Sequence, residues 1–262
     1  MSASRCWSRA LPVLALSMVM VVCVWIGLRA DHEVAIRAPA TCRDVGCYCE
    51  TTAMTGIRQP INAWSSLAPA LAGALVLLST LGATPRGGYP LARSRMPGIL
   101  LGSAACAIAV FSFHYHATLT WLGEWLDGVA LYLIAGFPIA WIAGRATRRG
   151  GRSFAVIYGA MAAVPALASW LVPAARRPAF LLIAATAIAV VLLNRKSTAG
   201  AGDRWLVLAL LSFGIALVAW ILDATRTVCA PDSWFQLHSL WHLLSVPTIV
   251  ALERFAAAQR AS

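Results

Sequence analysis

The chain has 262 residues, of which 60% are apolar and only 12% are charged, and its mean hydropathy is +0.74. This composition is not that of a soluble globular domain and predicts a polytopic membrane protein. The net charge of +11 comes from basic residues spread over several loops, with no clustered basic motif. We therefore expect attraction to anionic lipid head groups and no nucleic-acid partner.

Eight apolar runs are long enough to cross a hydrocarbon core about 30 Å thick, which takes about 20 helical residues. The sequence therefore predicts an all-α fold, in which an additional N-terminal transmembrane segment precedes a seven-transmembrane helix bundle. The runs are residues 11–28, 61–81, 98–116, 126–144, 154–172, 179–194, 205–222 and 235–252.

The first run follows Arg5 and Arg9 and belongs to an N-terminal segment of residues 1–29. It is either a retained anchor or a long signal peptide, since RAPA at residues 37–40 offers a small-residue cleavage site. Its length favours the anchor, because the apolar region of a signal peptide usually has about 7–15 residues.

Residues 30–60 form a segment too short to hold a core of its own, and we expect it to cap the outer face of the bundle. The bundle follows over residues 61–255, with a tail at residues 256–262. With the N-terminus inside, the inner segments hold 14 of the 21 Lys and Arg residues. This bias predicts that both termini are cytoplasmic.

Polar residues from three separate helices fall at the outer boundary of the bundle. Ser112 and His116 are four residues apart at the outer end of one helix, and Asp127 opens the next. His238 and His242 are again four apart near the outer start of the last helix, so each pair shares a helix face. Ionisable groups are costly at this depth, so the coincidence predicts one functional site.

Three histidines from two helices match an open catalytic zinc site, in which a nearby carboxylate could act as the general base or orient the metal-bound water. Each residue also has a structural interpretation: satisfied interfacial histidines, a packing serine and an Asp127 helix cap. The shared depth of all five favours the metal site. His114 faces away from His116 and is expected to be structural, and Glu124 is expected to be a solvated loop residue.

Four cysteines, Cys42, Cys47, Cys49 and Cys229, fall on the outer side in this topology. An oxidising outer compartment permits disulfides between them. An even count does not specify which cysteines pair, and some of them could be free thiols.

The stretch SFHYHATLTWLGEWLD at residues 112–127, with LHSLWHLL at residues 237–244, resembles the alkaline ceramidase family. That family belongs to a superfamily of seven-helix membrane hydrolases that includes the adiponectin and progestin receptors. RQPINAWSSLAPALAG at residues 58–73 is also similar to the family, and the resemblance covers residues 49–255.

The resemblance implies that His116, His238 and His242 hold Zn²⁺ and that Asp127 activates the zinc-bound water. Ser112 would steady the water or the oxyanion while the amide of a ceramide or another N-acyl lipid is cleaved. The resemblance also implies a disulfide between Cys49 and Cys229. The family's calcium site is doubtful here, because CYCETT at residues 47–52 keeps Glu50 alone and Gln59 stands near the position of a second acid.

The predicted function is therefore a zinc-dependent amidohydrolase whose partners are a membrane and a lipid substrate. A single Lys, many Ala and Arg residues and the extra N-terminal span favour a bacterial inner-membrane protein with its active site near the outer face. Two alternatives remain open: a receptor-like or lipid-binding protein without turnover, and a hydrolase of lipid esters. Retention of both Ser112 and Asp127 favours an enzyme, because a structural zinc is expected to have four protein ligands.

Overall fold

We analysed a computed structural model, which describes residues 3–43, 46–82, 91, 93–147, 149–194 and 202–261. Parts of the basic inner connectors, on which the predicted topology depends, lie outside the described residues. Most of the described residues fold into helices, as predicted. These are α1 (Ala3–Leu28), α2 (Ala30–Ile36), α3 (Pro60–Ser65), α4 (Ala68–Gly82), α5 (Met96–Thr118), α6 (Trp121–Arg145), α7 (Gly150–Leu171), the 3-10 turn η1 (Pro173–Ala175), α8 (Arg176–Leu193), α10 (Asp203–Ala224) and α11 (Leu237–Ala261). The described stretches between α2 and α3 and between α10 and α11 contain no helix.

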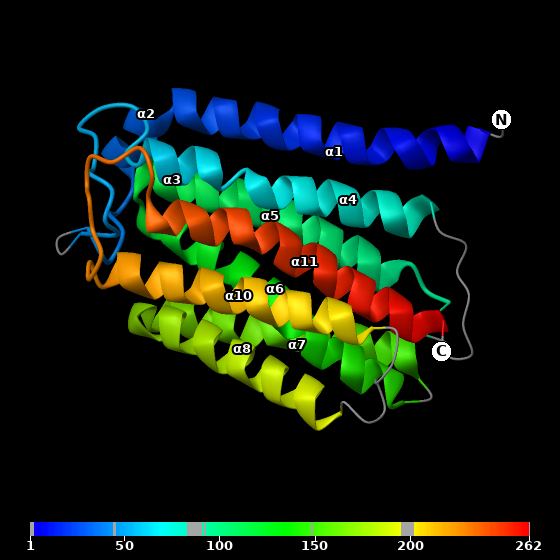
Figure 1. Cartoon of the computed structure of the whole chain (residues 1–262). Helices are drawn as coiled ribbons and strands as arrows, with labels where there is room; N and C mark the ends of the chain where they lie inside the picture. Colours follow the sequence, from blue (N-terminus) through cyan, green and yellow to red (C-terminus); the bar gives the residue numbers. More distant parts are fainter. Residues whose placement is uncertain are drawn as a thin grey trace.

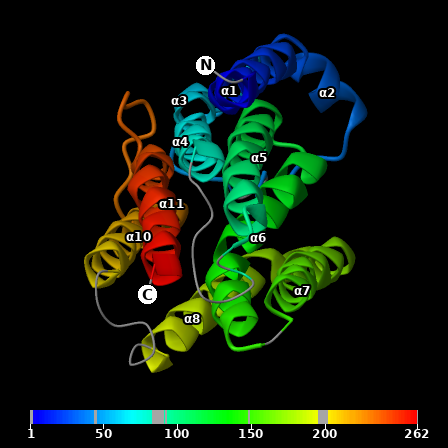
Figure 2. The same ribbon diagram turned by 90° about the vertical axis from the view of Figure 1, so that its right-hand side faces the viewer.

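The long helices lie side by side along one direction, with α1 at one edge of the bundle and α7 and α8 at the other (Figures 1 and 2). Among the described residues, seven helical stretches are long and apolar enough to cross a membrane. The stretch α11 is long enough but is not among them. The two histidines near its start and Glu253 and Arg254 near its end lower its hydropathy. The prediction of an all-α polytopic membrane protein is confirmed.

The run at residues 61–81 is broken into α3 and α4 by a turn at Ser66 and Leu67. Pro69 is the second residue of α4, where the missing N–H of a proline costs nothing, but it cannot continue a helix from the preceding turn. The turn separates α3 from α4, and α3 lies beside the end of α5 and the start of α11 (Figure 1).

The turn between α5 and α6 contains only two residues. Leu119 ends α5 in the left-handed conformation at φ 47°, and Thr120 caps α6 by accepting a hydrogen bond from the Gly123 N–H at 3.3 Å. A Cβ at Gly123 would lie 2.9 Å from Tyr115 Cα, so glycine allows α6 to start close to the end of α5. The helix α6 therefore begins five residues before the predicted run.

This early start corrects the expectation that Glu124 is a solvated loop residue. Glu124 lies in the first turn of α6, and its carboxylate accepts hydrogen bonds from the Thr41 N–H at 2.8 Å and the Thr41 hydroxyl at 2.6 Å. It also pairs with Arg176 at 2.5 Å. Glu124 thus joins residues 30–60, α6 and α8.

We call the end of the bundle covered by residues 30–59 the cap end, and the end where α1 begins and α11 finishes the far end (Figure 1). The disulfide Cys49–Cys229 ties the covering segment to the loop before α11, and a second disulfide, Cys42–Cys47, closes a short loop within the segment. The Arg58–Asp31 ion pair, at 2.9 Å, joins the two ends of the segment to each other.

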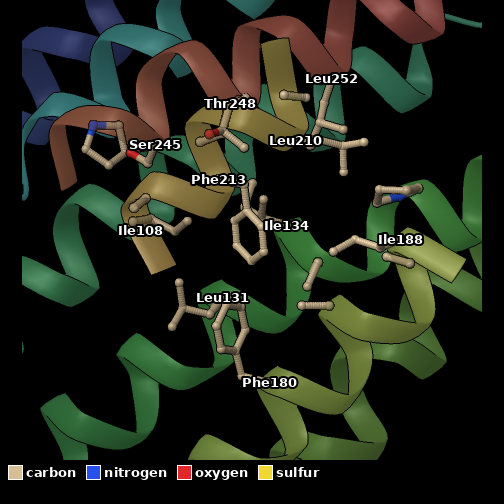
Figure 3. Close-up of a pocket in the computed structure, with 18 of the residues that line it drawn as sticks. Ile108, Leu131, Ile134, Phe180, Ile188, Leu210, Phe213, Ser245, Thr248 and Leu252 are labelled. Carbon is tan, nitrogen blue, oxygen red and sulfur yellow. The ribbon is translucent and has the colours of Figure 1, made fainter. Parts of the chain in front are cut away.

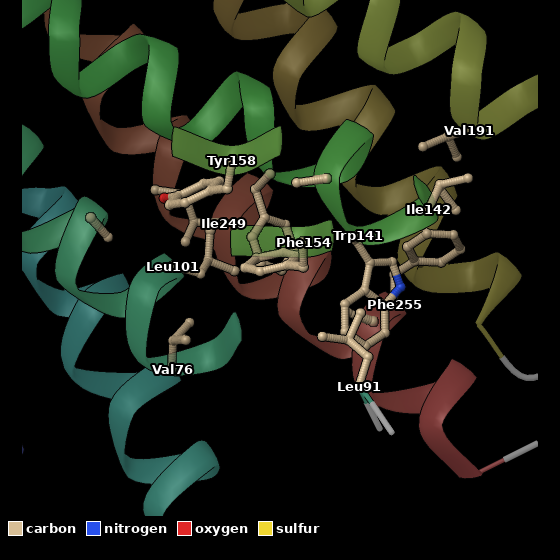
Figure 4. Packing of buried hydrophobic residues seen from close by; sticks show 14 of the residues in the cluster. Val76, Leu91, Leu101, Trp141, Ile142, Phe154, Tyr158, Val191, Ile249 and Phe255 are labelled. Carbon is tan, nitrogen blue, oxygen red and sulfur yellow. The ribbon is translucent and has the colours of Figure 1, made fainter. Parts of the chain in front are cut away.

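The largest apolar cluster lies toward the far end and is rich in aromatic rings (Figure 4). Phe154 stacks on Tyr158 with ring centroids 5.5 Å apart, and Phe137 meets Phe154 edge-on at 5.9 Å. Trp141 belongs to the same cluster and donates its indole N–H to Gln259 of α11 at 2.9 Å. These side chains fill the space between α5, α6, α7 and α11.

The helix α1 packs on α4 and α5 through one apolar stripe. Val19, Cys23 and Ile26 are buried against Ala109 and Phe113 of α5, whereas many other large side chains of α1 are exposed. Exposed apolar side chains on the outside of a membrane bundle face lipid, so this is the surface expected of a spanning helix.

Candidate metal centre and active site

Three histidines meet in the interior at the cap end. His116 lies in the last turns of α5, and His238 and His242 lie in the first two turns of α11. All three are buried, and one ligand nitrogen from each lies within 4.8 Å of the others. The Nε2 atoms of His116 and His238 are 3.1 Å apart. The two helices therefore bring together the three histidines that the sequence predicted as ligands.

The other ring nitrogen of His116 has a fixed partner. Its Nδ1 lies 2.9 Å from Gln59 Oε1, and the Gln59 amide nitrogen donates to the Glu50 carbonyl at 3.4 Å. This second hydrogen bond orients the amide so that its oxygen faces His116. Nδ1 must then carry the proton, which leaves the Nε2 lone pair free to bind a cation.

His242 is oriented in the same way by Ser65 of α3. The Ser65 hydroxyl donates its only hydrogen to the Asn62 carbonyl at 3.0 Å and lies 2.9 Å from His242 Nδ1. The hydroxyl oxygen therefore accepts from Nδ1–H, and Nε2 again offers its lone pair. Outer partners that orient metal-binding histidines in this manner are a regular feature of metal sites.

His238 is held by stacking and by its backbone. Its ring stacks on Tyr48 with centroids 3.8 Å apart, and its backbone N–H donates to Asp223 Oδ2 at 3.0 Å. The other oxygen of Asp223 accepts from the Cys49 N–H at 2.9 Å. Burial raises the pKa of the Tyr48 phenol well above its usual value, so this ring stays neutral beside the site.

These contacts fit a bound cation. Two of the three rings have their Nδ1 proton committed elsewhere, so their Nε2 lone pairs face one small buried volume. Unscreened lone pairs at this separation repel one another, and a cation between them removes the repulsion. Three neutral imidazoles suit zinc and leave a fourth tetrahedral position open.

Ser112 and Asp127 lie beside the histidines without belonging to the group of candidate ligands. Ser112 Oγ is 3.3 Å from His242 Nε2, and the Ser112 hydroxyl also hydrogen-bonds to the Asp127 carboxylate. Asp127 is half-buried, and it lines a cavity together with His238. All five predicted site residues are therefore close together.

His114 lies outside this group. Its Nε2 is 3.9 Å from the Glu33 carboxylate of α2, and it is not among the histidines that could share a metal ion. Its contact with Glu33 is one of the links between α2 and α5.

Sequence reasoning missed the residues that orient the histidines. The sequence carries no signal for Ser65, which resembles a small packing residue, or for Tyr48, which resembles an ordinary aromatic residue of a loop. Asp223 carried a signal, because it is a carboxylate within a long apolar helix and such groups are functional candidates. Gln59 was noticed only as a departure from an acidic position.

An apolar pocket of about 120 Å³ opens beside the histidines (Figure 3). It is lined by side chains of α4, α5, α6, α8, α10 and α11, including Leu131, Phe180 and Phe213. His242 forms part of its wall at the metal-centre side. Ser245 and Thr248 are the few polar groups in the lining. The lining suits a hydrocarbon chain.

The disulfide between Cys49 and Cys229 joins the covering segment to the loop before α11. It is the pair implied by the family resemblance. Cys42 pairs with Cys47, a connection that the sequence left open. Cys23 and Cys106 are free thiols within helices.

Comparison with known proteins identifies the family. The ceramidase family matches residues 48–260, a range that contains all the site residues described above and both cysteines of the Cys49–Cys229 bond. Human alkaline ceramidase 1 is 30% identical over 146 residues, which are 52% of this chain and 54% of the human protein. The chain thus matches about half the length of this curated relative. Because the family match extends over most of the sequence, the chain belongs to the ceramidase family.

Proposed function

We propose that the chain is a membrane-embedded, zinc-dependent hydrolase that cleaves the amide bond of ceramide or a related N-acyl lipid to a fatty acid and an amine. One observation carries the proposal. Three buried imidazoles converge next to a serine–aspartate pair, at the edge of an apolar pocket. Membership of the ceramidase family and the likeness to human alkaline ceramidase 1 support it.

His116, His238 and His242 would hold the metal through their Nε2 atoms. When bound, zinc polarises the substrate carbonyl and makes water more acidic. Gln59 and Ser65 keep two of the three rings in the tautomer that binds a cation.

Asp127 acts as the general base in this proposal. It takes a proton from the attacking water as the water oxygen forms a bond to the amide carbon. Asp127 then gives the proton to the amide nitrogen as the carbon–nitrogen bond breaks, so the carboxylate returns to its starting state. Water is the only co-reactant, and the products are the fatty acid and the free amine.

Ser112 positions the Asp127 carboxylate and the attacking water relative to each other. A hydroxyl has a single hydrogen, and Ser112 donates it to the Asp127 carboxylate. The Ser112 oxygen is then available to accept a hydrogen bond from the water. Its position 3.3 Å from His242 Nε2 puts it between the base and the histidines.

The apolar pocket would take a hydrocarbon chain of the substrate. Its lining offers almost no polar partner, so it favours an acyl chain over a water-soluble amide. The amide would then lie beside His242, where the pocket wall meets the metal centre.

We further propose that the cap end faces the outer side of a bacterial inner membrane, with both termini cytoplasmic and α1 retained as an anchor. Both disulfides lie at the cap end, as expected if that end faces an oxidising compartment. The bias of Lys and Arg toward the inner connectors supports the same orientation.

A substrate panel tests the proposed reaction. Zinc-loaded protein in detergent micelles is incubated with ceramides, other N-acyl lipids and phospholipids, and released fatty acid is identified by mass spectrometry. We expect fatty acid and amine in equal amounts from N-acyl lipids, and none with the Asp127→Asn variant. Fatty acid from phospholipids alone would indicate an ester hydrolase. Lipid binding without product would indicate a receptor-like protein.

A further inference from the structure

A second, smaller cavity of about 50 Å³ adjoins the metal centre at the cap end. It shares Leu131, Phe180 and Trp241 with the apolar pocket, and Leu131 and Phe180 are labelled in the view of that pocket (Figure 3). In contrast to the apolar pocket, its wall contains charged side chains from α6 and from the start of α8. The catalytic Asp127 is one of them.

Two neighbouring arginines in this wall differ in their partners. Arg176 is buried and forms an ion pair with Glu124 at 2.5 Å, so its charge is compensated. Arg177 is exposed, and no carboxylate in the described part of the chain pairs with it. The cavity therefore contains a guanidinium whose hydrogen-bonding groups are not used by a protein anion.

Aromatic rings hold Arg177 at the cavity. Its guanidinium carbon lies 6.0 Å from the Tyr48 ring centroid and 5.9 Å from that of Trp220. Both rings line the same cavity and are largely buried, so these contacts place the guanidinium of the exposed Arg177 at the edge of the cavity. Stacking on rings fixes a guanidinium but leaves its planar fork of N–H donors free.

The distance between Arg177 and the metal centre determines which part of a bound lipid the guanidinium can contact. Tyr48 also stacks on His238 with a centroid separation of 3.8 Å. The Arg177 guanidinium therefore lies within about 10 Å of the His238 ring, because the Arg177–Tyr48 and Tyr48–His238 distances together set this upper limit. This upper limit keeps the guanidinium within reach of a group on the amine side of a lipid whose amide lies at the histidines, because the guanidinium and the bound group each extend toward the other.

The two cavities divide the substrate between them. With the acyl chain in the apolar pocket and the amide beside His242, the amine part of an N-acyl lipid points toward the polar cavity. A neutral amine part would leave the Arg177 fork without a charged partner. An anionic oxygen group would use it, because a guanidinium binds carboxylates and phosphates through two parallel hydrogen bonds.

We propose that Arg177 selects N-acyl lipids that carry an anionic oxygen group, a carboxylate or a phosphate, a few bonds from the amide nitrogen on the amine side. This inference rests on the proposed amide hydrolysis and names the substrate class of the same site. Arg177 is a specificity residue here and takes no part in the proton transfers.

The test compares acidic and neutral substrates of equal acyl length. The probes are N-palmitoylglycine, the phosphate ester of N-palmitoylethanolamine, and neutral N-palmitoylethanolamine. We expect the ratio of kcat/KM for an acidic probe to that for the neutral probe to fall about tenfold or more in Arg177→Gln, the range of a hydrogen bond to a charged group. The carboxylate and phosphate probes show which anion the fork prefers.

Arg29→Gln is the matched control. Arg29 is also an exposed arginine stacked on a tryptophan, with its guanidinium carbon 5.2 Å from Trp25, but it does not line the cavity. We expect the ratio to stay within about twofold in this variant. An equal fall in both variants, or a wild-type ratio below one, would overturn the proposal.

A binding measurement separates this inference from the proposed reaction. Fluorescence of Trp220 and Trp241, which line the cavity, reports binding of N-palmitoylglycine to metal-free protein. We expect affinity about tenfold lower in Arg177→Gln and intermediate in Arg177→Lys, which keeps the charge but not the fork. Equal affinity in wild type and Arg177→Gln overturns the inference even if amides are hydrolysed. Absence of hydrolysis with the expected affinities refutes only the proposed reaction.

Discussion

The two ends of the bundle are held together by different kinds of interaction. At the cap end, His116, His242 and Asp223 each make a directed hydrogen bond to a residue far away in the sequence, and a disulfide closes the segment above them. At the far end, Phe137, Phe154 and their neighbours mainly fill space, and the hydrogen bond from Trp141 to Gln259 lies at the edge of their cluster (Figure 4). Packing tolerates changes that conserve volume, whereas a polar site depends on each partner being present.

This comparison predicts that substitutions at the cap end impair function in specific ways and that those at the far end mainly lower stability. The largest effect is expected for His238→Ala. Loss of one of three ligands should remove the metal and reduce lipid hydrolysis at least about 10³-fold, since a metal contributes several kcal/mol to such a reaction. Metal analysis and product release measure both.

His114→Ala is the control for His238→Ala, because His114 lies nearby but outside the ligand group. It should keep about one zinc per chain. Equal metal loss in the two variants would mean that the ligand assignment is wrong.

The second prediction compares the Cys49–Cys229 bond with the aromatic cluster. Replacing both cysteines by serine opens a loop with a sequence separation of 180 and should lower the free energy of unfolding by about 4 kcal/mol or more. Phe154→Ala should lower it by a similar amount, about 3–5 kcal/mol, through a cavity. Only the cysteine variant should also bind zinc more weakly, because Cys49 orients Asp223 under His238.

Thermal unfolding and zinc titration in the same detergent distinguish these outcomes. Replacing Cys42 and Cys47, with a separation of 5, should cost less stability than replacing the longer bridge. A loss of zinc affinity in Phe154→Ala as large as in the cysteine variant would contradict the division between the two ends.

The third prediction concerns Asp127, which is a base in our proposal and not a ligand. Asp127→Asn keeps the shape of the side chain but cannot take a proton, so hydrolysis should fall at least about a hundredfold while zinc content stays near normal. Loss of zinc would make Asp127 a ligand. Full turnover with full zinc would make it a helix cap.

The smallest effect is expected for the outer partner Gln59. Gln59→Ala removes the acceptor of His116 Nδ1–H and should weaken zinc binding by about 10–100-fold without abolishing it. Competition with a chelator measures the affinity. Ser79→Ala, at a serine of α4 that hydrogen-bonds within its own helix, is the control and should bind zinc as the wild type does.

Much of the fold could be predicted because apolar length alone identifies membrane helices. The wrong predictions concern segments in which local hydropathy does not indicate the secondary structure. Glu124 and the tryptophans around it resemble an interfacial loop, yet Thr120 caps a helix there, and Arg176 and Thr41 compensate the carboxylate. Both compensating residues are distant in the sequence, so no local pattern could reveal them.

The histidine group was predictable for a different reason. Spacing of four residues fixes a shared helix face, and the helix ends fix the depth, so His116, His238 and His242 could be placed together from the sequence. Ser65 and Gln59 could not, because their roles depend on how α3 packs against α5 and α11. The polar cavity around Arg177 depends in addition on the early start of α8.

The separation of the three histidines along the chain has a consequence for biosynthesis. His116 is inserted with α5, but His238 follows it by 122 residues, and Cys229 precedes His238. The membrane therefore receives nearly the whole bundle, and the cysteine that closes the cap, before the last two ligands arrive. In the proposed enzyme, metal loading would therefore follow insertion of the last helix, and a chain that lacks α11 would not yet have the ligands for hydrolysis.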